Sequence, residues 1–169
     1  MPNEIRIQLR QTSASTSEAT IRDHQVLIDR PSAKGGADAG PMGGELFLTS
    51  VAGCFMSNLL AAIKARNAAI SGVRIDVAGM LAETPARFES VDLNVTAETA
   101  DSKALAQVIE IADRGCIMMN TLRGKLDIRI QIGAPVGPTR RIADLLDPMI
   151  EVRPAQPLAW GCGNTGHIP

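Results

Sequence analysis

The stretch GPMGGELFLTSVAGCFMSNLLAAI, residues 40–63, decides the fold because its second part is the longest uncharged run in the chain. The run extends from Leu46 to Ile63, with Glu45 before it and Lys64 after it. A segment of this length has to be considered as a membrane span. Small and polar residues interrupt it, however, namely Thr49, Ser50, Gly53, Ser57 and Asn58. We therefore expect no membrane contact, but a central helix that is buried on nearly all sides.

Strand patterns precede and follow this helix. Ile5, Ile7 and Leu9 alternate with polar residues, which predicts a half-buried strand, and residues 19–21 and 26–28 predict a hairpin turning near Asp23 and His24. Residues 31–44 are rich in Gly, Ala and Pro, a composition that predicts a mobile loop. After the helix, residues 73–81 and 88–95 predict an antiparallel pair joined by a turn at 84–86.

A second helix follows, with Asp101 or Ser102 as its cap and its end near Gly115. Its predicted core residues recur at helical spacing: Leu105, Val108, Ile109 and Ala112. Residues 126–132 then alternate as another strand. This order lacks a strict βαβ alternation and predicts an α+β fold with a mainly antiparallel sheet. We expect one domain over residues 1–132 and a Pro/Gly-rich C-terminal extension, residues 133–169, that wraps the domain.

Composition excludes several classes of function. A formal net charge of −1 and an aromatic content of 2% provide neither a basic surface for phosphates nor a stacking platform for bases, so we expect no nucleic-acid partner. The first ten residues lack the apolar core of a secretory signal, which predicts a cytoplasmic protein. In a reducing compartment, the three cysteines are then catalytic, metal-binding or simply buried.

The C-terminal region contains two motifs that we expect to carry no ligand. Residues 161–166 spell G-x-G-x-x-G, but only three residues follow, which is too few for the helix that would bind a pyrophosphate. Cys162 and His167 lack the further ligands that a structural zinc site with four ligands needs, since the only other histidine is His24. We therefore expect no cofactor and no metal.

Cys54 and Cys116 allow two interpretations from the residues alone. A thiol buried in an apolar helix normally has a raised pKa and is inert. Cys116, which directly follows the second helical pattern, is equally compatible with simple packing, since cysteine often serves as a small hydrophobic residue.

Three motifs in order resemble the OsmC/Ohr family. They are Gly40-Pro41-Met42-Gly43-Gly44-Glu45-Leu46 running on to Ala52-Gly53-Cys54-Phe55, then Gly72-Val73, then Cys116 with Asn120-Thr121-Leu122. The resemblance covers residues 19–132. It implies an intertwined homodimer with two active sites at the subunit interface, and a thiol-dependent peroxidase that reduces organic hydroperoxides.

The resemblance also implies roles for individual residues. Cys54 matches the peroxidatic thiol, Cys116 the resolving thiol, and Glu45 the carboxylate that orients an arginine. Arg22 is the first candidate for that arginine, ahead of Arg10 and Arg30. The sequence Cys116-Ile117-Met118 departs from the Cys-Pro-Val common in the family. The implied reductant is a dithiol, either a lipoyl group or a small thiol.

Spacing adds an independent argument for the dimer. Nine residues separate Glu45 from Cys54, which places them on opposite faces of one helix. A partner subunit would bring the two groups together. The alternative hypothesis is a non-catalytic member of the fold that binds a small apolar ligand at the dimer interface. Met42, Met118 and Met119 are candidates for an adaptable lining of an apolar pocket, because thioether side chains are flexible. Cys162 is a candidate for an additional resolving thiol.

Overall fold

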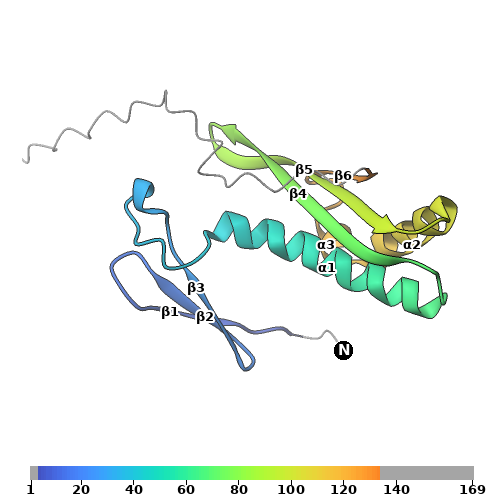
Figure 1. Cartoon of the computed structure of the whole chain (residues 1–169). Coiled ribbons are helices and arrows are strands. Elements are labelled where there is room, and N and C mark those ends of the chain that lie inside the picture. Colours follow the sequence, from blue (N-terminus) through green and yellow to red (C-terminus); the bar gives the residue numbers. More distant parts are fainter. Residues whose placement is uncertain (1–3, 134–169) are drawn as a thin grey trace, which may run out of the picture. The chain divides into compact units, whose positions relative to one another are not determined.

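The computed structural model describes residues 4–133, whose helices and strands follow one another in an order close to the predicted one (Figure 1). The elements are β1 (Gln8–Gln11), β2 (Ser17–Ile21), β3 (His24–Ile28), the 3₁₀ turn η1 (Ser32–Lys34), α1 (Gly43–Ala65), β4 (Ser71–Glu83), β5 (Ala86–Glu98), α2 (Ser102–Gly115), α3 (Ile117–Leu122) and β6 (Asp127–Ile132). The predicted C-terminal extension lies outside the described residues, apart from Gly133.

The strands form two sheets of three strands each, in the orders β1-β2-β3 and β4-β5-β6. All pairs are antiparallel except β5 with β6, which is parallel. This arrangement confirms the α+β class and the mainly antiparallel sheet. The first strand begins later than predicted, at Gln8, and Ile5 and Ile7 are exposed rather than half-buried.

The core lies between one face of α1, the helix α2 and the β4-β5-β6 sheet. Helix α1 contributes Val51, Phe55, Leu59 and Ala62, which recur every three or four residues and therefore share one face. Complete burial of a Val, Leu or Phe side chain stabilises a fold by roughly 1.5–3 kcal/mol. All four core residues predicted for the second helix are buried, and its predicted cap is confirmed because Asp101 accepts a hydrogen bond from the Ala104 amide.

The opposite face of α1 is exposed in the single chain, so the helix is not buried on nearly all sides as predicted. Ser50, Gly53, Ser57 and Leu60 all lie on this exposed face. Within the described residues, α1 is the one helix whose length and composition would allow it to cross a membrane. Its packing against α2, α3 and β4 accounts for the apolar residues on its inner face.

The loop between β3 and α1 follows a defined path, in contrast to the mobile loop that its composition predicts. It contains the turn η1, and its backbone is hydrogen-bonded to the end of β3 through Asp38 N–H to the Arg30 carbonyl and Asp29 N–H to the Pro41 carbonyl. Glycine in this loop lets two backbone segments lie in direct contact, because a Cβ at Gly36 would overlap the Arg30 carbonyl. This composition therefore reflects packing of backbone on backbone.

Candidate functional site

The two cysteines singled out in the sequence meet in the structure. The thiol of Cys116 donates a hydrogen bond to the Cys54 sulfur, with an Sγ–Sγ distance of 3.3 Å, although the residues are 62 positions apart. Cys116 is fully buried, whereas Cys54 is partly exposed at the edge of the core. Both thiols are free. The pair therefore combines one accessible sulfur with one that the core holds in place.

A break between two helices directs Cys116 toward α1. Helix α2 ends at Gly115, Cys116 adopts an extended conformation with φ −81° and ψ 121°, and α3 begins at Ile117. The helix α3 was not predicted from the sequence, because six residues are too few to show a helical period. This one-residue junction places the Cys116 thiol beside the middle of α1.

Asn58 lies at the contact between α1 and this junction. Its side-chain amide donates to the Cys54 carbonyl over 2.9 Å, and its Oδ1 would lie 3.2 Å from a Cβ added to Gly115. Glycine at 115 therefore lets the end of α2 approach the turn of α1 that carries Cys54. The sequence reasoning did not include Asn58, although its position four residues after Cys54 places both on neighbouring parts of one helix face.

The environment shifts the pKa values of the two thiols in opposite directions. Burial raises the pKa of the Cys54 thiol, but hydrogen bonds from the Met118 amide, the Cys116 thiol and the Ile117 amide outweigh it and lower the pKa overall. Burial is also the main reason why the pKa of the Cys116 thiol is raised, and proximity to Cys54 raises it further. Cys54 is consequently the better thiolate and Cys116 the better proton donor.

Glu45 lies in the first turn of α1, on the same continuous helix as Cys54. Its Oε2 accepts a hydrogen bond of 2.7 Å from the Met42 amide, which satisfies a backbone donor at the start of the helix. The nine-residue spacing within one helix leaves Glu45 and Cys54 on opposite faces, as the sequence predicts. In the single chain, Glu45 thus caps the helix and does not reach the thiol pair.

Arg22 occupies the exposed turn between β2 and β3 with a positive φ of 55°. Among residues 4–133, no ion pair or hydrogen bond joins its side chain to Glu45 or Cys54. Of the other two candidates, Arg10 is paired with Glu18 at 2.7 Å, and Arg30 is exposed at the start of the β3–α1 loop. The single chain therefore brings none of the three candidate arginines to the thiols.

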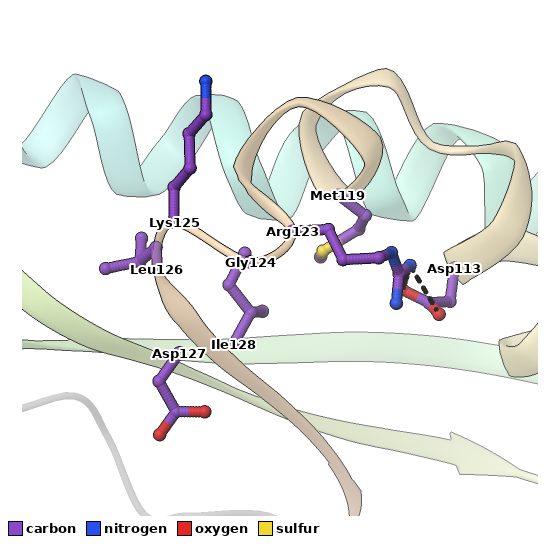
Figure 2. A pocket seen from close by; sticks show the side chains of 8 residues that line it. All are labelled: Asp113, Met119, Arg123, Gly124, Lys125, Leu126, Asp127 and Ile128. Carbon is purple, nitrogen blue, oxygen red and sulfur yellow. Dashed lines mark hydrogen bonds and ion pairs between the residues drawn. The ribbon is translucent and has the colours of Figure 1, made fainter.

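Two of the hollows on the described surface differ in character, and neither of these two is lined by Cys54 or Cys116. The larger, of about 500 Å³, lies between α3 and β6 and is bordered by the Asp113–Arg123 ion pair, Lys125 and Asp127, with Met119 among its lining residues (Figure 2). The other, of about 380 Å³, is an apolar groove between the first sheet and α1. Its lining residues are Ile7, Leu9, Ala19, Ile21, Val26, Ile28, Leu46, Thr49 and Ser50.

Metal ligands do not gather in the described part of the chain. Among residues 4–133, no group of three or more His, Cys, Asp or Glu side chains is arranged to hold a metal ion. The G-x-G-x-x-G motif, Cys162 and His167 all lie outside the described residues. Met42, Met118 and Met119 belong to different environments, since Met119 is buried in the core and the other two are partly exposed.

Comparison with known proteins identifies the fold and the family. No curated protein sequence matches the chain. An OsmC-like protein from Mycoplasma pneumoniae has a similar structure, with a TM-score of 0.70 and 18% identity over 79% of this chain and 98% of that one. The organic hydroperoxide resistance protein OhrB of Bacillus subtilis has a TM-score of 0.58 and 21% identity over 78% of this chain and 98% of that one.

A third similar structure is an organic hydroperoxide resistance protein OsmC from Legionella pneumophila, with a TM-score of 0.63 and 18% identity, covering 78% of this chain and 98% of that one. At these identities the structural likeness shows the fold alone. The sequence model of the OsmC-like protein family matches residues 35–131, which is more than half of the chain and includes both cysteines of the pair. The chain belongs to the OsmC-like protein family.

Proposed function

We propose that the protein is a thiol-dependent peroxidase that reduces organic hydroperoxides through Cys54 and Cys116. The observation that carries this proposal is the Sγ–Sγ distance of 3.3 Å between a partly exposed thiol of lowered pKa and a buried one of raised pKa. Family membership and the organic hydroperoxide resistance proteins among the similar structures support a peroxide-related role.

The proposed reaction has three steps. The Cys54 thiolate attacks the terminal oxygen of the hydroperoxide, the O–O bond breaks, and the released alkoxide takes a proton, which gives an alcohol and Cys54 sulfenic acid. The Cys116 thiol then attacks the Cys54 sulfur, which forms the disulfide and releases water. An external dithiol, a lipoyl group or a small dithiol compound, reduces the disulfide by exchange and is itself oxidised.

The short distance between the sulfurs suits the second step. A disulfide has an S–S length of about 2.05 Å, so the sulfurs have to approach by little more than 1 Å from 3.3 Å. The first step requires stabilisation of the thiolate. In the single chain this comes from the Met118 and Ile117 amides and the Cys116 thiol, which lower the pKa of Cys54.

A homodimer completes the proposed site. Within one chain, Glu45 and Arg22 lie away from Cys54, and we propose that the partner subunit supplies Arg22, with Glu45 orienting it. The exposed face of α1 and the apolar groove beside it support this proposal, because Ile7 and Leu9 are 57% and 54% exposed in the single chain. Apolar surface of this kind is commonly covered by a partner.

One experiment tests the peroxidase proposal directly. The reduced protein, with Cys162→Ser to leave only the pair, receives one equivalent of an organic hydroperoxide, and its unreduced peptides are weighed by mass spectrometry. We expect a Cys54–Cys116 disulfide and consumption of the peroxide. In Cys116→Ser we expect a sulfenic acid on Cys54 that reacts with dimedone. A Cys54 that remains a free thiol while the peroxide persists refutes the proposal.

The apolar groove favours a second candidate function, the non-catalytic binding of a small apolar ligand. Its volume of about 380 Å³ and its wholly aliphatic strand lining suit an acyl or aryl group. The same peroxide experiment separates the two functions. The binding function is supported if the protein binds an apolar fluorophore, the Val26→Asp variant does not bind it, and the peroxide leaves Cys54 unoxidised.

A further inference from the structure

One buried carboxylate holds both ends of the loop that joins the first sheet to α1. Asp29 directly follows β3 and is 3% exposed. Its Oδ1 accepts from the Arg30 amide over 2.7 Å, and its Oδ2 accepts from the Ala37 amide over 3.0 Å and from the Ala39 amide over 3.2 Å. Its own amide donates to the Pro41 carbonyl. A single side chain therefore fixes the path from the sheet to the helix.

Asp29 also binds the turn that precedes β2. The Thr16 hydroxyl donates to its Oδ2 over 3.2 Å, and Thr16 is itself buried, with the Ser13 hydroxyl donating to its Oγ1 over 2.7 Å. Burial raises the pKa of the Asp29 carboxyl, but hydrogen bonds led by those from the Ala39 and Arg30 amides hold the pKa at about 2. The Asp29 carboxyl group that holds the loop and the Thr16 turn is thus ionised at neutral pH.

Side-chain packing between the first sheet and α1 is incomplete. The apolar groove of about 380 Å³ separates Val26 and Ile28 of β3 from Leu46 and Ser50 of α1. Close packing fixes the angle between two elements only where their side chains fill the space between them. In the single chain, the orientation of the first sheet relative to α1 therefore depends more on the hydrogen bonds to Asp29 than on apolar contacts.

A small rotation at Asp29 has a large effect at the far end of the strand. Asp29 directly follows β3 and Arg22 lies in the turn before it, next to Asp23, so at least the length of the five residues of β3 separates them. At about 3.4 Å per residue this is roughly 17 Å, and a swing of about 10° would displace the Arg22 turn by roughly 3 Å. Displacements of about 1 Å are enough to disturb catalytic geometry.

We infer that Asp29 is a positioning residue: by binding the β3–α1 loop and the Thr16 turn, it sets the direction in which the hairpin presents Arg22. The part of this inference that concerns catalysis rests on the proposed function, in which Arg22 reaches the thiol site of the partner subunit. The part that concerns geometry, a fixed angle between the hairpin and α1, is independent of it.

A distance measurement tests the geometry. Spin labels are attached at Asp23→Cys and Lys64→Cys in the full chain, with Cys54, Cys116 and Cys162 replaced by serine and the labelled protein diluted with unlabelled protein. We expect one narrow distance distribution. Asp29→Asn is expected to broaden it or to shift its mean by about 3 Å, the displacement that a swing of about 10° would give at the far end of β3. Thr16→Val should have a smaller effect, and Glu18→Gln, which removes the charged partner of Arg10 elsewhere on the same hairpin, should have none.

The inference is overturned if folded Asp29→Asn keeps the distribution of the parent. If that variant does not fold, Thr16→Val decides, and an unchanged distribution in it overturns the inference equally. Activity tests the link to Arg22: Asp29→Asn should slow oxidation of Cys54 by hydroperoxide at least tenfold, and should cause no further loss in an Arg22→Ala background. Equal losses in both backgrounds refute that link. A parent without peroxidase activity refutes the proposed function, whereas the spin-label distances still decide the role of Asp29.

Discussion

Formation of a Cys54–Cys116 disulfide is expected to stabilise the domain by a calculable amount. The two residues are 62 positions apart, and closing a loop of that length removes conformational entropy from the unfolded chain worth about 4 kcal/mol at 25 °C. For a domain of this size, 1 kcal/mol corresponds to roughly 4 °C in Tm, so the oxidised protein should melt roughly 15 °C above the reduced protein.

The native state should retain most of this gain because its geometry requires little change. The sulfurs begin 3.3 Å apart, and the Cys116 side chain is already fixed in the core. Strain in the native state would reduce the gain, since disulfides stabilise only where the fold accommodates their geometry. The measured shift in Tm therefore reports how well the reduced pair is preorganised for closure.

The assay compares thermal unfolding of the reduced and diamide-oxidised protein, with Cys162→Ser in both and equal protein concentration throughout. Diamide oxidises thiols without a peroxide, so the result does not depend on peroxidase activity. Cys54→Ser treated in the same way is the control, and its Tm should not change. A disulfide verified by mass that leaves Tm unchanged or lowers it would refute the reasoning, because the pair would then be strained on closure.

Three further predictions follow from the described contacts. Cys116→Ala should raise the pKa of Cys54, measured by the pH dependence of its alkylation, because a donor to the thiolate is lost, whereas Cys116→Ser should keep it close to the parent. The folded pKa of Asp29, about 2, lies below its unfolded value, so ionised Asp29 should stabilise the fold fully above about pH 4. This stabilisation should be lost as the pH falls toward 2. In acid unfolding, Asp29→Asn should not show this loss of stability. Gly40→Ala should expose the β3–α1 loop to proteolysis, because a Cβ there overlaps the Leu27 carbonyl; a variant as resistant as the parent would contradict the packing.

The sequence predicted those elements whose pattern extends over several periods. The β4–β5 pair and the four buried residues of α2 were correct because a strand pattern over eight or nine residues, or a 14-residue amphipathic helix, leaves little ambiguity. The helix α3 was missed because it is less than two turns long. The loop from 31 to 44 was predicted to be mobile because glycine serves flexibility and close backbone packing alike, and only the fold distinguishes them.

The candidate site was also predicted only in part. The pairing of Cys54 and Cys116 was anticipated from motifs, and the structure adds their distance and the opposite shifts of their pKa values. Asp29 was not anticipated, because its importance lies in donors from positions 16, 30, 37 and 39, which have no fixed sequence spacing. Arg22 and Glu45 stay predictions, since a single chain does not hold the interface that would assemble them.

Oligomeric state is therefore the first property to measure, because several separate features depend on it. In a monomer, the exposed face of α1, the apolar groove and the unpaired position of Arg22 would each need its own explanation. In the proposed dimer, one contact would cover the apolar residues, bring Arg22 toward a thiolate and place Glu45 within its reach. Light scattering that finds a monomer at micromolar concentration would remove Arg22 and Glu45 from the site. The amides of Met118 and Ile117 and the Cys116 thiol would then be the groups that activate Cys54.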